Sequence, residues 1–114
     1  MASISNSELF LLLDAQGGLI AFQETGAPWA GMLAFSSEEL AREFVRKSGI
    51  KAAEIAAIAT DDPGAVAAIV SAAKRLTIRN LLLDLDYKTG ACTEIEFEGD
   101  GLGAARPRQF TPKP

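Results

Sequence analysis

Two neighbouring segments near the end of the chain constrain its fold most strongly. Residues 81–86 read Leu-Leu-Leu-Asp-Leu-Asp, and residues 93–98 alternate between uncharged side chains and carboxylates. Strict alternation is typical of a strand with one buried face, and the turn residues at 87–90 between the segments predict a β-hairpin. Because a slip of one residue moves every side chain to the other face, this pattern also restricts the pairing.

The loop of this hairpin is expected to contain three residues, 88–90, with Gly90 in the left-handed conformation. That loop length keeps the carboxylates out of the core. Asp84 then faces Glu94, and Leu82 faces Glu96, on one side of the sheet. The other side is the expected core face of the hairpin and carries Leu83, Leu85, Thr93, Ile95 and Phe97.

Two helix signals precede the hairpin. The stretch 36–39, Ser-Ser-Glu-Glu, has the spacing of a capping box, with Ser36 as the cap of a helix that ends near Ser48. Asp62 and Pro63 supply the N-cap and the first turn of a second helix. Short apolar runs predict four further strands, at residues 9–13, 19–22, 32–35 and 55–59.

The predicted fold class is therefore α/β (α+β), in the order β-β-β-α-β-α-β-β, as a single domain over residues 1–98. Strand–helix–strand links favour parallel neighbours and hairpins add antiparallel ones, so we expect one mixed sheet of five or six strands. The two short helices are expected to cover one face of this sheet well and the other poorly. Gly, Pro and isolated charges dominate residues 99–114, which predicts a flexible tail.

Composition excludes several functions. The chain has 11 Lys and Arg against 15 Asp and Glu, and three of the basic residues fall in the predicted tail. An acidic body does not offer the clustered positive surface that nucleic acids or anionic membranes require. With no histidine and one cysteine, Cys92, the chain cannot build a Cys–His or Ser–His–Asp centre or a Cys/His zinc site. The lone cysteine and the lack of a signal-peptide pattern predict a cytoplasmic location, and no cofactor is expected.

The predicted hairpin places three carboxylates side by side: Asp84, Glu94 and Glu96. One interpretation is a site for a divalent cation or a basic partner. The other is a solvated surface whose charges keep an edge strand from pairing. Asp86 extends this side of the sheet, and Leu82 adds an apolar side chain that favours a contact with a protein.

Two other features have competing interpretations. Asp84-Leu85-Asp86 resembles the aspartate pair of haloacid-dehalogenase-type phosphatases, which implies a minimal phosphatase using Asp84 and Asp86; the alternative is a strand that runs out into a polar turn. Trp29 follows Pro28 in a Gly- and Pro-containing loop. It is either an anchor for a partner or a plug at the edge of its own core.

Residues 33–44, Leu-Ala-Phe-Ser-Ser-Glu-Glu-Leu-Ala-Arg-Glu-Phe, resemble a segment of the SseB-like N-terminal domain family. Members of that family show a short hydrophobic strand followed by a Phe-[Ser/Thr]-Ser-Glu-Glu helix start. In the order of elements the resemblance extends over about residues 8–98. It implies an α/β binding or regulatory module without catalytic activity, and it transfers no active-site residue.

The sequence thus predicts a non-catalytic interaction or regulatory module that binds a protein partner or itself, most simply as a homodimer. The candidate contact residues are Trp29, Leu82, Asp84, Asp86, Glu94 and Glu96. The alternative is a regulatory domain that binds a cation or small ligand through Asp84, Glu94 and Glu96.

Overall fold

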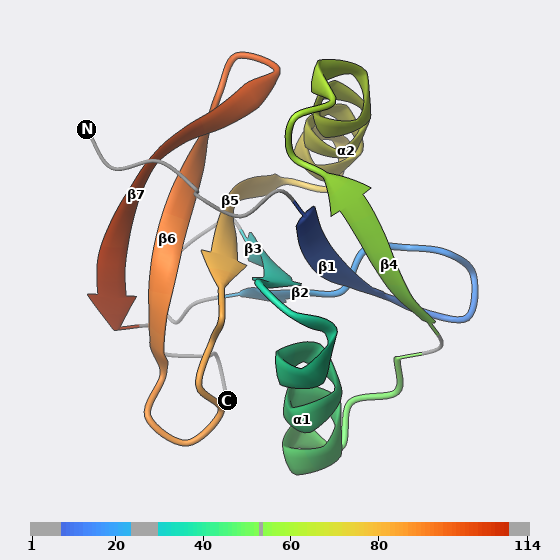
Figure 1. Cartoon of the computed structure of the whole chain (residues 1–114), viewed down its shortest axis with the longest axis vertical. Coiled ribbons are helices and arrows are strands. Elements are labelled where there is room, and N and C mark those ends of the chain that lie inside the picture. The colour runs from blue at the N-terminus through green and yellow to red at the C-terminus, as the bar shows by residue number, and fades with distance from the viewer. Residues whose placement is uncertain (1–7, 24–29, 53, 110–114) are drawn as a thin grey trace.

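The computed structural model describes residues 8–23, 30–52 and 54–109, which form two helices and one open mixed sheet (Figure 1). The strand order is β4-β1-β3-β5-β6-β7, and β2 pairs with β3 beside this path. The predicted order of elements and the mixed sheet are confirmed, with seven strands instead of five or six. The bounds are β1 (Glu8–Leu13), β2 (Ala21–Gln23), β3 (Ala30–Phe35), α1 (Glu38–Ser48), β4 (Glu54–Ala59), α2 (Pro63–Arg75), β5 (Ile78–Leu83), β6 (Ala91–Glu98) and β7 (Gly101–Gln109).

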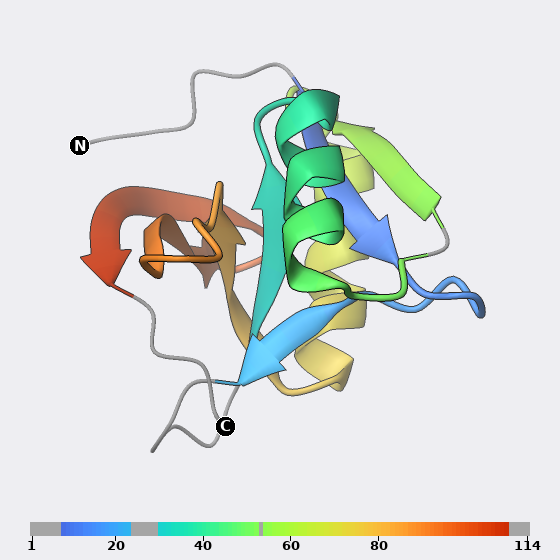
Figure 2. The same ribbon diagram turned by 90° about the horizontal axis from the view of Figure 1, so that it is seen from below.

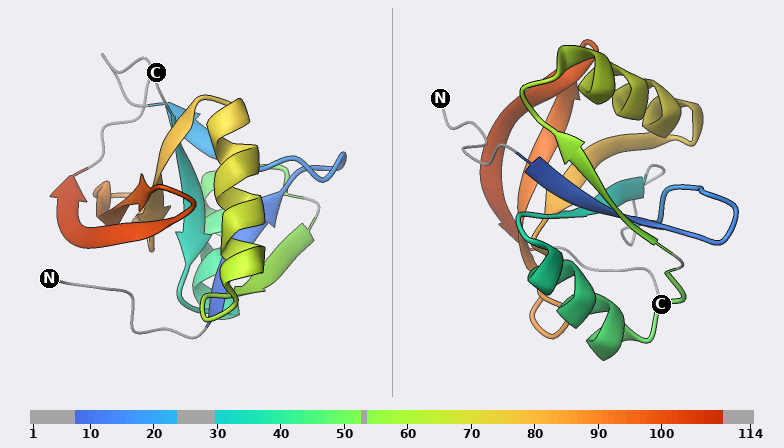
Figure 3. Two further views of the ribbon diagram at one scale, coloured as in Figure 1. Left: turned by 90° about the horizontal axis from the view of Figure 1, so that it is seen from above. Right: turned by 45° about the vertical axis from the view of Figure 1, so that its right-hand side comes forward.

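The two helices lie on opposite faces of the sheet, each over its own core, which corrects the expectation that one face is poorly covered. α1 crosses β3 and β1 on one side (Figure 2), and α2 lies on the other (Figure 3). Because side chains alternate along a strand, neighbours such as Leu11 and Leu12 enter different cores. The α2 core contains Leu9, Leu11, Met32, Ala34, Ala73, Ile78, Leu81 and Ile95. The α1 core contains Leu12, Leu33, Phe35, Ala41, Phe44, Leu82 and Leu85.

Local capping explains where each helix begins and ends. The side chain of Asp62 accepts hydrogen bonds from the backbone N–H groups at the start of α2, with Pro63 in the first turn, as predicted. α1 ends at Gly49, which has a φ of 72° and donates its N–H to the carbonyl of Val45. The N-cap of α1 is Ser37 and not Ser36, because the N–H and hydroxyl of Ser36 are bonded to Asp84 instead.

The expectation of a flexible tail is wrong for residues 101–109, which form β7 antiparallel to β6. The composition of an edge strand explains the error, because Gly and Pro are tolerated where only one side of a strand is paired. Leu102 and Ala105 nevertheless pack against the α2 core. The last five residues, 110–114, lie outside the described part of the chain.

The hairpin of β5 and β6 has the predicted faces but a different register. Glu94 pairs with Leu82 instead of Asp84, a shift of two residues that preserves the parity. Ile95 is fully buried on the α2 side, as expected. The loop is longer than predicted because Asp84 has left the ladder with a φ of 54°, and Leu85 consequently packs in the α1 core instead of beside Leu83.

Neither helix in the described ranges is long and apolar enough to cross a lipid bilayer.

Candidate functional site

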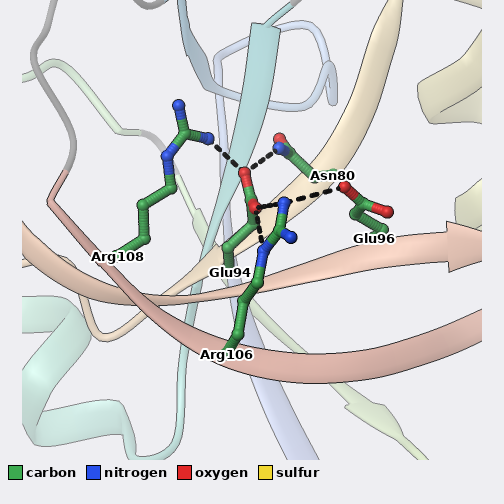
Figure 4. A network of polar contacts seen from close by, with 5 residues as sticks. All are labelled: Asn80, Glu94, Glu96, Arg106 and Arg108. Atoms are coloured by element: carbon green, nitrogen blue, oxygen red, sulfur yellow. Dashed lines mark hydrogen bonds and ion pairs between the residues drawn. The ribbon is translucent and has the colours of Figure 1, made fainter.

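A network of five polar side chains covers one face of β5, β6 and β7 on the α1 side (Figure 4). At its centre is Glu94, whose side chain is only 2% exposed. Arg106 donates from Nε and Nη2 to Glu94 Oε1 at 2.9 and 2.6 Å, and Arg108 donates to Oε2. Arg106 also reaches Glu96 Oε1 at 3.0 Å. The prediction that Glu94 lies on a solvated acidic surface is therefore wrong, because β7 covers it with two guanidinium groups.

Asn80 completes the coordination of Glu94 from the β5 side. Its Nδ2 donates to Glu94 Oε2 at 2.6 Å, and its side chain is as buried as those of the core. The space for it exists because β3 carries Gly31 next to it. A Cβ at position 31 would lie 2.7 Å from Asn80 Oδ1 and 2.7 Å from Leu82 Cγ. A side chain at position 31 would therefore displace Asn80 and disturb its hydrogen bond to Glu94.

The charges of Glu94, Glu96, Arg106 and Arg108 balance within this network. Two carboxylates, Glu94 and Glu96, meet two guanidinium groups, so no net charge remains to attract an ion. The hydrogen bonds and charge of Glu94, followed by the charge of Glu96, raise the pKa of Arg106. Removing an arginine from this network is costly, because Glu94 is buried and then loses part of its counter-charge, whereas Arg106 itself is 64% exposed. Chemically, the arrangement fixes the register of β6 against β7.

Cys92 lies on the same strand and is half-buried. Burial, followed by the negative charge of Glu94, raises the pKa of its thiol to about 11. The thiolate is the nucleophilic form of cysteine, and at neutral pH this side chain is almost entirely protonated.

Asp84 and Asp86 have separate structural roles. Asp84 Oδ1 accepts the N–H of Ser36 at 2.8 Å and Oδ2 accepts its hydroxyl at 2.7 Å, which ties the end of β5 to the start of α1. Asp86 is exposed and accepts the N–H groups of Lys88 and Thr89, and these bonds lower its pKa. The polar-turn interpretation of this segment matches the observed geometry.

Of the residues predicted to form one contact or cation site, Glu94 and Glu96 are brought together by Arg106, whereas Leu82 and Asp84 have separate contacts. Leu82 is fully buried in the α1 core, which removes it from any partner surface. Asp84 is bonded to Ser36, and Glu94 and Glu96 are bonded to Arg106. Among the described residues, no group of three or more acidic or cysteine side chains is placed to hold a metal ion. Trp29 lies outside the described residues.

A different feature, the outer edge of β4, stands out when the ends of the sheet are compared. β4 pairs with β1 over six consecutive residues without a register shift, and it forms one end of the strand order. Glu54 is its one charged residue, followed by Ile-Ala-Ala-Ile-Ala. The other end, β7, contains Pro107 between two arginines and pairs with an irregular register. Proteins commonly blunt edge strands with charges, prolines and bulges, and β4 has one charge at its first residue.

A groove of about 410 Å³ runs between α1 and the start of β4. Its apolar side chains are Val45, Ala52 and Ile55, and charged side chains from α1 and β4 form its rim. A larger groove of about 550 Å³ lies between the start of α2 and the β6–β7 turn. The smaller groove includes Glu54 and Ile55, the first two residues of β4.

The sequence predicts a strand at residues 55–59, but its short apolar run does not indicate that the strand lies at the end of the sheet. Charged residues on both sides of the uncharged run mark where this strand begins and ends. Glu54 directly precedes the uncharged run, Lys51 stands three residues before Glu54, and Asp61 and Asp62 follow the run. Both Lys51 and Asp61 are exposed.

A scan of protein-family models found no match to this chain, and searches of curated proteins and of solved structures likewise found none.

Proposed function

We propose that this protein is a non-catalytic interaction module that self-associates through the outer edge of β4. The observation that carries the proposal is the contrast between the two ends of the sheet. β4 presents an apolar, regular backbone edge, whereas β7 carries Pro107 and two arginines. Addition of a strand to an open edge supplies backbone hydrogen bonds, and neighbouring pockets accept alternate side chains.

The state of the reactive groups supports a binding role over catalysis. Cys92 has a thiol pKa of about 11, both oxygens of Asp84 are bonded to Ser36, and the charge of Glu94 is neutralised. The net charge of −4 supports a protein partner over a nucleic acid. The resemblance to the SseB-like N-terminal domain family agrees with such a module, and a single cysteine agrees with a cytoplasmic location.

The test compares two alanine-to-lysine variants, one on each edge strand. Ala57 in β4 and Ala104 in β7 are both exposed, so each variant places one new charge at an edge without filling the core. Sedimentation velocity at micromolar concentrations should show a dimer for the unmodified protein and for Ala104→Lys, and a monomer for Ala57→Lys. The proposal would be refuted if the unmodified protein remained monomeric. It would also be refuted if the two variants associated equally.

A further inference from the structure

The geometry points to a binding site for a small organic amine in the groove of about 550 Å³ between α2 and the β6–β7 turn, which we call the α2 groove. This inference goes beyond the proposed self-association and does not depend on it. One wall is formed by residues between 60 and 67 and the other by residues 100–103, which lie side by side in two views (Figures 1 and 3). Pockets that hold small molecules have volumes of about 300 to 1,000 Å³, so the space is of a suitable size.

Apolar side chains line much of the α2 groove. Val66 is buried in α2, and Leu102 packs from β7 against the α2 core. Pro63 and Ala67 add further apolar surface on the side of the helix. This lining favours a ligand with a hydrocarbon body, because contact between the two removes apolar surface from water.

The ionisable groups that line the α2 groove are both carboxylates. Asp61 stands in the turn before α2 and Asp100 in the β6–β7 turn, so each wall supplies one. Both are exposed, and within the described ranges neither side chain takes part in a hydrogen bond or an ion pair. Lys74 donates to the carbonyl of Gly99 at 2.7 Å and does not line the groove. An apolar space with two unpaired negative charges is complementary to a positively charged ligand.

These two walls fit an organic cation better than a metal ion. A divalent cation such as Ca²⁺ takes about six oxygen ligands or more. Within the described part of the chain, no three acidic or cysteine side chains are placed together for such an ion. An ammonium group needs fewer partners and can be attached to an apolar body. The body would contact Val66 and Leu102 while the ammonium group reaches the carboxylates, so the ligand class is a primary amine on a compact apolar group.

Probes that share one apolar body and differ in charge test this site. Phenethylammonium should shift the amide NMR resonances of residues 60–67 and 100–103, with a dissociation constant in the millimolar range. Phenethyl alcohol has the same ring without the charge and should bind about threefold to tenfold more weakly, since exposed charges contribute modestly. Added salt should weaken the binding of the ammonium probe alone. Equal affinities for the two probes, or shifts confined to other parts of the protein, would overturn the inference.

Matched variants separate the contribution of charge from that of shape. Asp61→Asn and Asp100→Asn should each weaken phenethylammonium binding about threefold, whereas Glu39→Gln, an exposed change on α1, should have no effect. Ala67→Leu fills the groove and should abolish binding, whereas Ala68→Leu alters an exposed neighbour outside the lining and should not. Unchanged affinity in both asparagine variants would overturn the role of the carboxylates, and so would an equal loss in Glu39→Gln.

A blocked lysine, N-acetyl-lysine methylamide, distinguishes a free amine from the side chain of a protein partner. It carries the same ammonium group on a flexible stem, and its apolar body is smaller than that of phenethylammonium. We therefore expect it to bind more weakly. Tighter binding of the blocked lysine would overturn the assignment to a small molecule. A monomeric protein that binds phenethylammonium would refute the proposed self-association and leave this site intact.

Discussion

At the scale of single residues, Glu94 shows how its surroundings decide what a carboxylate does. Its place in an alternating strand is that of a solvent-facing side chain, yet it is buried beneath Arg106 and Arg108. Asn80 provides a further donor from the opposite strand. Burial of Glu94 is possible because both of its carboxylate oxygens accept hydrogen bonds from guanidinium or amide groups of the protein.

Removing the charge of Glu94 should therefore destabilise the fold. For Glu94→Gln we expect the free energy of unfolding to fall by about 2 kcal/mol, because Asn80, Arg106 and Arg108 lose a charged hydrogen-bond acceptor. Urea unfolding followed by circular dichroism measures the change. Glu96→Gln is the control: its side chain is 64% exposed, so it should lose much less. Equal losses in the two variants would contradict the assigned role of Glu94.

The thiol of Cys92 gives a prediction about pH. Because its folded-state pKa of about 11 exceeds the ordinary thiol value of 9.0, the folded protein retains the thiol proton over a pH range in which the unfolded chain releases it. The stability contributed by this group is therefore complete below pH 9 and declines as pH rises toward 11. The difference in unfolding free energy between the unmodified protein and Cys92→Ser should shrink or reverse over this interval. A pH-independent difference would show that the thiol ionises normally.

At the scale of elements, the signals that predicted structure correctly were local. The N-cap at Asp62, the proline at position 63 and the glycine at position 49 act through backbone groups within one turn, so they can be found in the sequence. β7 could not be predicted in this way. Its sequence, Gly-Leu-Gly-Ala-Ala-Arg-Pro-Arg-Gln, lacks alternation, and its pairing depends on the long-range match to β6. The burial of Glu94 depends on the same pairing, so the network was equally beyond local reasoning.

Hydrogen–deuterium exchange can distinguish a paired β7 from a tail. If residues 101–109 are a strand, amides bonded to β6 should exchange far more slowly than an unstructured peptide of this sequence, with faster exchange at alternate positions that face outward. Pro107 has no amide and gives no signal. Uniformly fast exchange over these residues would mean that β7 does not form.

At the scale of the whole molecule, the sheet separates the acidic groups that a flat hairpin would gather. Asp84 lies at the junction of β5 and α1, Glu94 is buried beneath the arginines of β7, and Glu96 is exposed beside Arg106. The opposite placement of α1 and α2 likewise buries Leu82, which the sequence placed on an exposed side. The burial of Leu82 and the separation of the acidic groups depend on how helices pack on the sheet, which a local sequence pattern does not encode.

This separation predicts the response to divalent ions. Millimolar Mg²⁺ or Ca²⁺ should leave the midpoint of thermal unfolding unchanged, because a ligand stabilises a fold only when it binds the folded state. Differential scanning fluorimetry with a matched monovalent salt as control measures this. A rise in the midpoint that disappears in Asp84→Asn would contradict the expected indifference to these ions.

The proline and arginines of β7 also limit how far association can proceed. In the proposed dimer the β4 edges of both copies are paired with each other, so the sheet would end in two β7 strands, which contain Pro107 and an irregular register. Growth by repeated addition, the route by which open sheets become fibres, has no site to continue from. The proposed association would therefore stop at two copies, because only the β4 end of the sheet has a regular, uncharged edge.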